Sequence, residues 1–168
     1  YYCVIPHILA YATDLWLHAT SAALVITAQG GGSVLGKLLV WLISKQIGSR
    51  LTLILLLFLQ ALALFILMQA SSLWTFLALG AIFGFGFGAT SPIRTSMIPE
   101  FFGLRAVGTI IGLSNAAYSI GGLAGPVVAG YIFDMSRNYD AAFIAGGLLL
   151  IIGMAAAYFL KAPEQKAV

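Results

Sequence analysis

A single lysine stands inside an apolar, glycine-rich stretch and is the first candidate for chemistry in this sequence. Residues 21–44 carry no charged side chain except Lys37, which precedes Ser44 by seven positions. In a helix, Lys37 would lie about 10 Å from that end. A lysine near the centre of a membrane span costs about 2.5–3.5 kcal/mol, a cost that a packing role does not require. We therefore expect Lys37 to face a water-filled cavity and bind a carboxylate. The alternative is a side chain that extends to the membrane surface and only anchors the helix.

Four polar side chains could complete such a site. His7 and Tyr11 share one face of the first apolar segment at helical spacing, and Asn115 and Tyr118 give the fifth segment a polar side. Each could hydrogen-bond a carboxylate held by Lys37, and His7 could also carry a proton. The alternative is a polar stripe that packs against neighbouring helices. We take all five as the predicted substrate-binding residues.

Catalytic chemistry has little support in this sequence. There is one cysteine, there are two histidines, and no acidic residue lies inside an apolar stretch, so no nucleophile–base pair or metal cluster can be assembled. Residues 31–37 match the pattern G-x-x-x-x-G-K of a phosphate-binding loop. Leu38 stands where that loop needs Ser or Thr, and no strand precedes it. We predict no catalytic residue, no metal and no cofactor, and a protein that is not an enzyme.

Composition and hydropathy predict the elements that hold these residues. Of 168 residues, 61% are hydrophobic and 8% are charged, against about 25% charged in soluble domains. The mean hydropathy is +1.04. No basic run or aromatic–basic pattern points to nucleic acid. We predict an all-α integral membrane protein whose first apolar segment is too short to cross a bilayer and is the end of a longer helix. The predicted spans are residues 1–14, 21–44, 51–69, 73–95, 106–132 and 141–160.

The distribution of cations predicts which side of the membrane each loop faces. With six spans, the turn at 45–50, the connector at 98–105 and the C-terminal tail fall on one side. The positive-inside rule places that side in the cytoplasm, because the opposite side holds only Arg137. We expect a multi-pass protein of the cell membrane with a cytoplasmic C-terminus. The cations on the cytoplasmic side are Lys45, Arg50, Arg94, Arg105, Lys161 and Lys166.

Small residues mark the predicted contacts between helices. Two stretches carry glycines at a spacing of four, and in the second a proline follows that would kink its helix. The glycines before Lys37 are also expected to let helices approach closely. Arg94, near the end of its span, is expected to extend to the membrane surface or to pair with a loop. The alternative is a residue that binds substrate. The residues predicted for packing and a hinge are Gly80, Gly84, Gly88, Gly121, Gly125 and Pro126.

The order of these features resembles the C-terminal half of a major facilitator superfamily transporter. The turn from Lys45 to Arg50 is similar to the second copy of that superfamily's cytoplasmic loop motif, G-x-L-x-D-R-x-G-R-R. Residues 99–105 resemble its penultimate cytoplasmic loop, and Gly125-Pro126 its hinge helices. The resemblance covers nearly the whole chain and implies one six-helix half of a twelve-helix fold, with the N-terminal half absent. It also implies a cytoplasmic loop site made of Lys45, Gly48, Arg50, Glu100 and Arg105.

Within the superfamily, residues 6–14 and Gly36-Lys37 resemble the monocarboxylate transporter and oxalate/formate antiporter group. That group commonly has an arginine that engages a carboxylate at the position of Lys37, so the resemblance implies that Lys37 binds substrate. In the antiporter branch a second cation sits in the penultimate helix. Only Asn115 and Tyr118 stand there in this sequence, which weighs against a dianion such as oxalate.

Together these features predict secondary active transport of a small organic anion, such as a monocarboxylate, by alternating access. In such folds the substrate site lies near the membrane midplane between two repeats, so the missing N-terminal half would form the opposite wall. The expected partners are the substrate, a proton or counter-substrate, that missing half and the lipid bilayer, with no nucleic acid. The alternative is a non-transporting membrane scaffold or half-size subunit.

Overall fold

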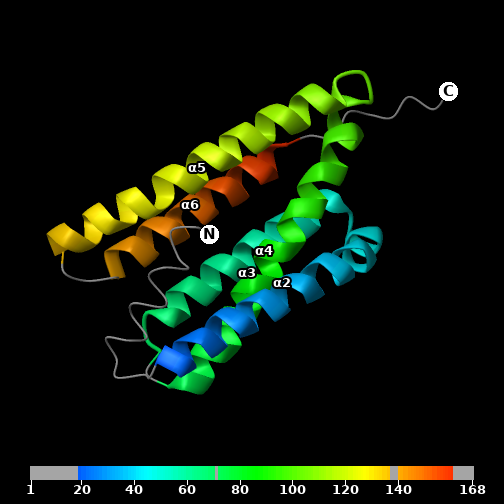
Figure 1. Cartoon of the computed structure of the whole chain (residues 1–168). Helices are drawn as coiled ribbons and strands as arrows, with labels where there is room; N and C mark the ends of the chain where they lie inside the picture. The colour runs from blue at the N-terminus through cyan, green and yellow to red at the C-terminus, as the bar shows by residue number, and fades with distance from the viewer. Residues whose placement is uncertain (1–18, 71, 137–139, 161–168) are drawn as a thin grey trace.

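The structure, a computed structural model, describes residues 19–70, 72–136 and 140–160, and its regular elements there are all α-helices. The first predicted span, with His7 and Tyr11, lies outside these residues. Five helices follow one another along the described chain (Figure 1): α2 Ala19–Ile47, α3 Ser49–Leu67, α4 Leu73–Phe102, α5 Val107–Ser136 and α6 Asp140–Phe159.

Four of these helices, α2 to α5, are long and apolar enough to cross a membrane. The described apolar part of α6, Phe143–Phe159, is shorter. The five helices correspond in order to the second to sixth predicted spans, and the prediction of an all-α membrane protein is confirmed. The arrangement as a six-helix half of a larger fold stays a prediction.

The closest contact between helices joins α2 to α4, which run parallel. Glycines of one helix face the backbone of the other, and at each of these points a Cβ atom would overlap a backbone carbonyl. Only glycine allows two helix backbones to come this near, and the short distance maximises their van der Waals contact. The facing pairs are Gly84 with Gln29, Gly88 with Ser33, Gly32 with Ala81 and Gly36 with Phe85.

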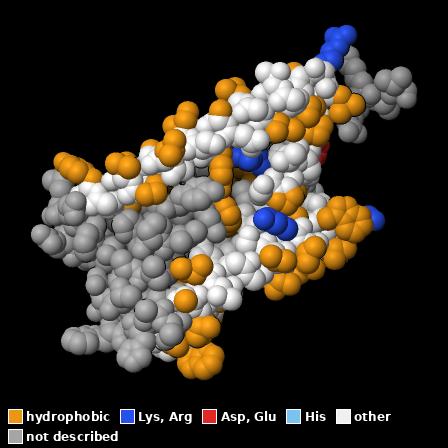
Figure 2. Space-filling model, in the orientation of Figure 1, with side chains coloured by type: hydrophobic (Ala, Val, Ile, Leu, Met, Phe, Trp, Pro, Cys, Tyr) orange, Lys and Arg blue, Asp and Glu red, His pale blue; other side chains and the backbone are white. Residues whose placement is uncertain are grey.

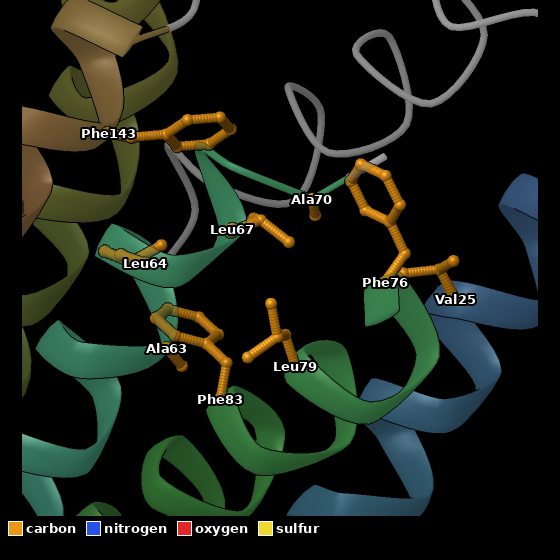
Figure 3. Packing of buried hydrophobic residues seen from close by; sticks show 9 residues of the cluster. All are labelled: Val25, Ala63, Leu64, Leu67, Ala70, Phe76, Leu79, Phe83 and Phe143. Carbon is orange, nitrogen blue, oxygen red and sulfur yellow. The ribbon is translucent and has the colours of Figure 1, made fainter. Parts of the chain in front are cut away.

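The third helix, α3, packs between α4 and α6. Buried side chains form one cluster where α2, α3, α4 and α6 meet, and Phe143 of α6 is 1% exposed there (Figure 3). The opposite side of α3 carries large apolar side chains that recur every three or four residues and are exposed, as expected of a face in contact with lipid. The cluster consists of Val25, Ala63, Leu64, Leu67, Ala70, Phe76, Leu79, Phe83 and Phe143. The exposed stripe consists of Leu51, Leu55, Phe58, Leu62 and Ile66.

Three helices extend further than the hydropathy predicts. The span predicted at 21–44 is the helix Ala19–Ile47. The span expected to end at residue 95 continues through Pro99 to Phe102, and Gly103, with φ 72°, ends it. The expected connector at 98–105 is therefore largely helical. Likewise, α5 continues to Ser136 instead of 132. Hydropathy detects the apolar part of a helix, whereas backbone hydrogen bonds carry the helix on into polar sequence, and a proline removes only one donor.

The fifth helix, α5, is the least covered element. None of its most apolar 18-residue window is buried, and its large apolar side chains Leu113, Leu123 and Val127 are each more than two-thirds exposed. Figure 1 shows α5 beside α6 and apart from α2. A helix with this much exposed apolar surface is covered by lipid or by another protein surface when it is in the membrane.

Candidate functional site

The predicted central residue, Lys37, is exposed on α2. It has no hydrogen bond or ion pair with the described part of the chain. The residue before it, Gly36, faces the backbone of α4, so Lys37 lies at the edge of the contact between α2 and α4. Its ammonium group keeps all three donors for water or a ligand. Its role in substrate binding stays a prediction.

Asn115 and Tyr118 contact a different cation, Arg94 of α4. The Arg94 Nη2 donates a hydrogen bond to the Asn115 Oδ1 at 3.1 Å. The guanidinium carbon of Arg94 lies 5.3 Å from the centroid of the Tyr118 ring, which is within the range of a cation–π contact. The expectation that Arg94 extends to the membrane surface or pairs with a loop is therefore wrong. The structure brings Asn115 and Tyr118 together around this arginine and not around Lys37.

The Arg94 side chain is held within the depth of the helices. Arg94 lies eight residues before Phe102, the end of α4, and Asn115 lies eight residues after Val107, the start of α5. The short connection between these helices places both residues at a similar depth. Tyr118 lies three residues further along α5, about 4.5 Å deeper. Because the ring that the guanidinium covers is on the deeper side, Arg94 does not extend toward the surface.

No acidic group compensates the charge of Arg94 in the residues that the structure describes. Both of its contacts, an amide oxygen and an aromatic ring, are neutral. The acidic residue of α4 nearest to it in sequence, Glu100, is exposed and six positions away, which places it on a different side of the helix. Arg94 is half-buried, so its positive charge remains available to an anion on the open side of the guanidinium.

The residues of the predicted cytoplasmic loop site lie at the helix ends. The Arg50 Nε donates to the carbonyl oxygen of Ala157 at 3.2 Å, and its guanidinium lies 5.3 Å from the Tyr158 ring. Since Ala157 is in the last turn of α6, Arg50 satisfies a carbonyl that has no partner within its helix. Lys45 lies over the Trp41 ring at 5.3 Å. Gly48 joins α2 to α3 with φ 83°, and Glu100 and Arg105 are exposed. Their joint role stays a prediction.

The two predicted glycine ridges lie in different surroundings. Gly80, Gly84 and Gly88 all face α2. A Cβ at Gly121, in contrast, would have no neighbour within 4 Å. Pro126 lies inside α5, which continues through it. The first ridge therefore packs against a described helix, whereas Gly121 faces open space.

Two buried glutamines are polar features that the sequence analysis missed. Gln60 of α3 is 4% exposed, and its Nε2 donates to the Leu56 carbonyl at 3.1 Å and to the Thr90 Oγ1 at 3.2 Å. Gln29 of α2 is 2% exposed, and its Nε2 has no partner in the described chain. The sequence does contain a signal for them, namely a glutamine inside an apolar span, because such an amide needs a buried hydrogen-bond partner.

An apolar groove lies on another part of the described surface. An apolar groove of about 480 Å³ opens between α2, α3 and α4, lined among others by Leu35, Leu59 and Phe85. Neither Lys37 nor Arg94 lines it. Within the described ranges no group of three or more His, Cys, Asp or Glu residues could hold a metal ion.

Comparison with known proteins places this chain among transporters. Residues 1–168 match the family model of the Major Facilitator Superfamily. "Monocarboxylate transporter 13" of Rattus norvegicus is 29% identical over 157 residues, covering 91% of this chain and 36% of that relative. "Monocarboxylate transporter 11" of Homo sapiens is 26% identical over 169 residues, covering 91% of this chain and 34% of that relative. "Probable sulfoacetate transporter SauU" of Cupriavidus necator is 32% identical over 69 residues, covering 38% of this chain and 16% of that relative. The chain spans about a third of the length of the two monocarboxylate transporters.

Proposed function

We propose, from the premise that this chain belongs to the major facilitator superfamily, that it is part of a secondary transporter of a small organic anion, such as a monocarboxylate. The relatives named for monocarboxylates and for sulfoacetate are all named for carboxylates. In the proposed cycle the carboxylate crosses the membrane by alternating access, with a proton or a counter-substrate. The chain would then be the C-terminal six-helix half, with its C-terminus in the cytoplasm.

The observation that carries this proposal is Lys37. It is a lysine in a helix that is apolar enough to span a membrane, it is exposed, and no described residue neutralises it. A cation in such a position is stabilised by an anion or by water in a cavity. The substrate carboxylate would be that anion when the site is loaded.

The uncovered surface of α5 supports the presence of a second half of similar size, which would lie beside this chain in the membrane. The uncovered apolar face of α5, which includes Leu113, Leu123 and Val127, would lie against a second six-helix half. In repeat-based transporters the site lies between the two halves near the midplane. We propose that the N-terminal half supplies the wall opposite Lys37.

Uptake by the intact protein tests this proposal. In proteoliposomes, labelled lactate is expected to accumulate, and comparison at two pH values reports whether a proton accompanies it. Lys37→Gln is expected to lower lactate uptake by about tenfold or more, since a charge-assisted contact is lost, whereas Lys37→Arg keeps part of it. Lys166→Gln, which removes a cation from the C-terminal tail, is the control and leaves the KM for lactate unchanged. Lys37→Gln uptake equal to that of the parent refutes the proposal.

A further inference from the structure

Lys37 lies somewhat deeper than the start of the Arg94 side chain. The parallel helices α2 and α4 face each other at Gln29 with Gly84 and Ser33 with Gly88, and also at Gly32 with Ala81 and Gly36 with Phe85. The first two pairs are 55 residues apart in sequence and the last two are 49 apart, and the mean sets Lys37 level with about residue 89 of α4. Arg94 is about five residues further along, which is about 7.5 Å along the helix axis. Its guanidinium turns back toward the level of Lys37, because it lies over the Tyr118 ring on the deeper side.

The two cations also lie on the same side of the α2–α4 pair. Leu35 and Phe85 both line the apolar groove beside α3. Lys37 is two residues after Leu35, and Arg94 is nine residues after Phe85. At 100° per residue, each cation is therefore on the opposite side of its helix from a residue that lines the groove. Figure 2 shows Lys and Arg side chains, in blue, on the face of the molecule that this view presents.

The close approach of the two helices brings these side chains within reach of one molecule. Because glycines remove the side chains between α2 and α4, the helix axes are nearer than in ordinary packing, for which about 8–10 Å is typical. The long stems of lysine and arginine can span such a distance from both sides. Arg94 also keeps donors for a ligand, since guanidinium has five N–H groups and Asn115 accepts from one nitrogen.

We propose that Arg94 is a second anion-binding residue of the site that contains Lys37, and that this site takes a small dianion, a molecule with two acidic groups on a short carbon chain. Asn115 and Tyr118 are positioning residues, which hold the guanidinium on the deeper side of Arg94, toward the level of Lys37. This inference rests on the proposed function and adds the substrate class. It differs from the expectation in the sequence analysis, where a dianion is disfavoured because the penultimate helix, α5, carries no second cation. The second cation proposed here is on α4.

The test compares two labelled acids of three carbons that differ in charge, lactate with one carboxylate and malonate with two. The intact protein in proteoliposomes is expected to transport malonate with a lower KM than lactate. Arg94→Gln is expected to raise the KM for malonate by about tenfold or more and that for lactate by about threefold at most, because only the dianion uses both cations. Lys37→Gln raises both.

Variants of the positioning residues separate positioning from a structural role. Tyr118→Phe keeps the ring under the guanidinium and is expected to keep the malonate-to-lactate preference, whereas Tyr118→Leu and Asn115→Ala are expected to lose it through a raised KM for malonate. Arg94→Lys keeps the charge without the fixed fork and is expected to retain an intermediate preference. It also keeps the inference testable if Arg94→Gln does not fold. Lys166→Gln, which removes a cation from the C-terminal tail, leaves the preference unchanged.

Each other outcome overturns the dianion site. A parent protein that transports lactate and not malonate refutes it while leaving the proposed function intact, and so does an Arg94→Gln variant with unchanged malonate KM. Equal losses for both acids in Arg94→Gln identify Arg94 as a structural link between α4 and α5. If the parent transports neither acid and Lys37→Gln changes nothing, the proposed function fails as well.

Discussion

The close contact between α2 and α4 can be tested by comparing alanine substitutions at two consecutive glycines, Gly31 and Gly32. A Cβ at Gly32 would overlap the backbone of Ala81, whose carbonyl carbon would be 2.9 Å away, whereas a Cβ at Gly31 would have no neighbour within 4 Å. Backbone cannot move aside as a side chain can. Gly32→Ala is therefore expected to cost about 1–3 kcal/mol in the free energy of unfolding, the range for overpacking. Gly31→Ala is expected to gain about 0.5–1 kcal/mol, because alanine loses less conformational entropy in a helix.

Thermal unfolding of the detergent-solubilised intact protein measures both effects. Gly32→Ala is expected to lower Tm by a few degrees, and Gly31→Ala to leave it equal or to raise it slightly. The two variants share helix, depth and chemistry, so the difference between them isolates the contact with α4. A Gly32→Ala protein as stable as Gly31→Ala would refute the close parallel packing and, with it, the placement of Lys37 relative to Arg94.

Three further predictions follow from the helix ends and the topology. Gly48→Ala is expected to cost about 1–3 kcal/mol in thermal unfolding, because φ at that position is 83° and alanine rarely adopts it; an unchanged Tm would contradict this. Arg50→Gln removes the bond to the Ala157 carbonyl and is expected to speed hydrogen exchange in the last turn of α6 while leaving the first turn of α4 unchanged. A cysteine introduced at Asn138 is expected to react with an impermeant reagent from outside intact cells and one at Glu164 is not, and the reverse pattern would invert the topology.

The sequence was sufficient for the helices and for the glycine ridge. A continuous apolar stretch long enough to cross a membrane predicts a helix, because the backbone groups in lipid must form their hydrogen bonds within the segment. Gly80, Gly84 and Gly88 were predicted to pack from their spacing alone, and their contacts lie on α2. The helix ends were less accurate. Pro99 and Glu100 are typical of a loop in water, yet both lie inside α4.

The partners across helices could not be predicted from spacing. Arg94 and Asn115 are on different helices, and nothing in the order of residues along the chain tells which faces of α4 and α5 meet. Asn115 and Tyr118 were assigned to Lys37 because all three are polar and in apolar spans, whereas the structure joins them to Arg94. Gln60 illustrates the same limit, because its bond to Thr90 depends on the packing of α3 against α4.

The central claim is that a positive charge at position 37 binds the transported anion, and chemical restoration of that charge tests it most directly. In a Cys3→Ser background, Lys37→Cys is expected to lose lactate uptake. Reaction of the new thiol with 2-aminoethyl methanethiosulfonate, which restores an ammonium group, is expected to recover a large part of the uptake, whereas the neutral methyl methanethiosulfonate is not. Uptake by Lys37→Cys at the level of the Cys3→Ser parent, or equal recovery with the neutral reagent, would contradict the claim.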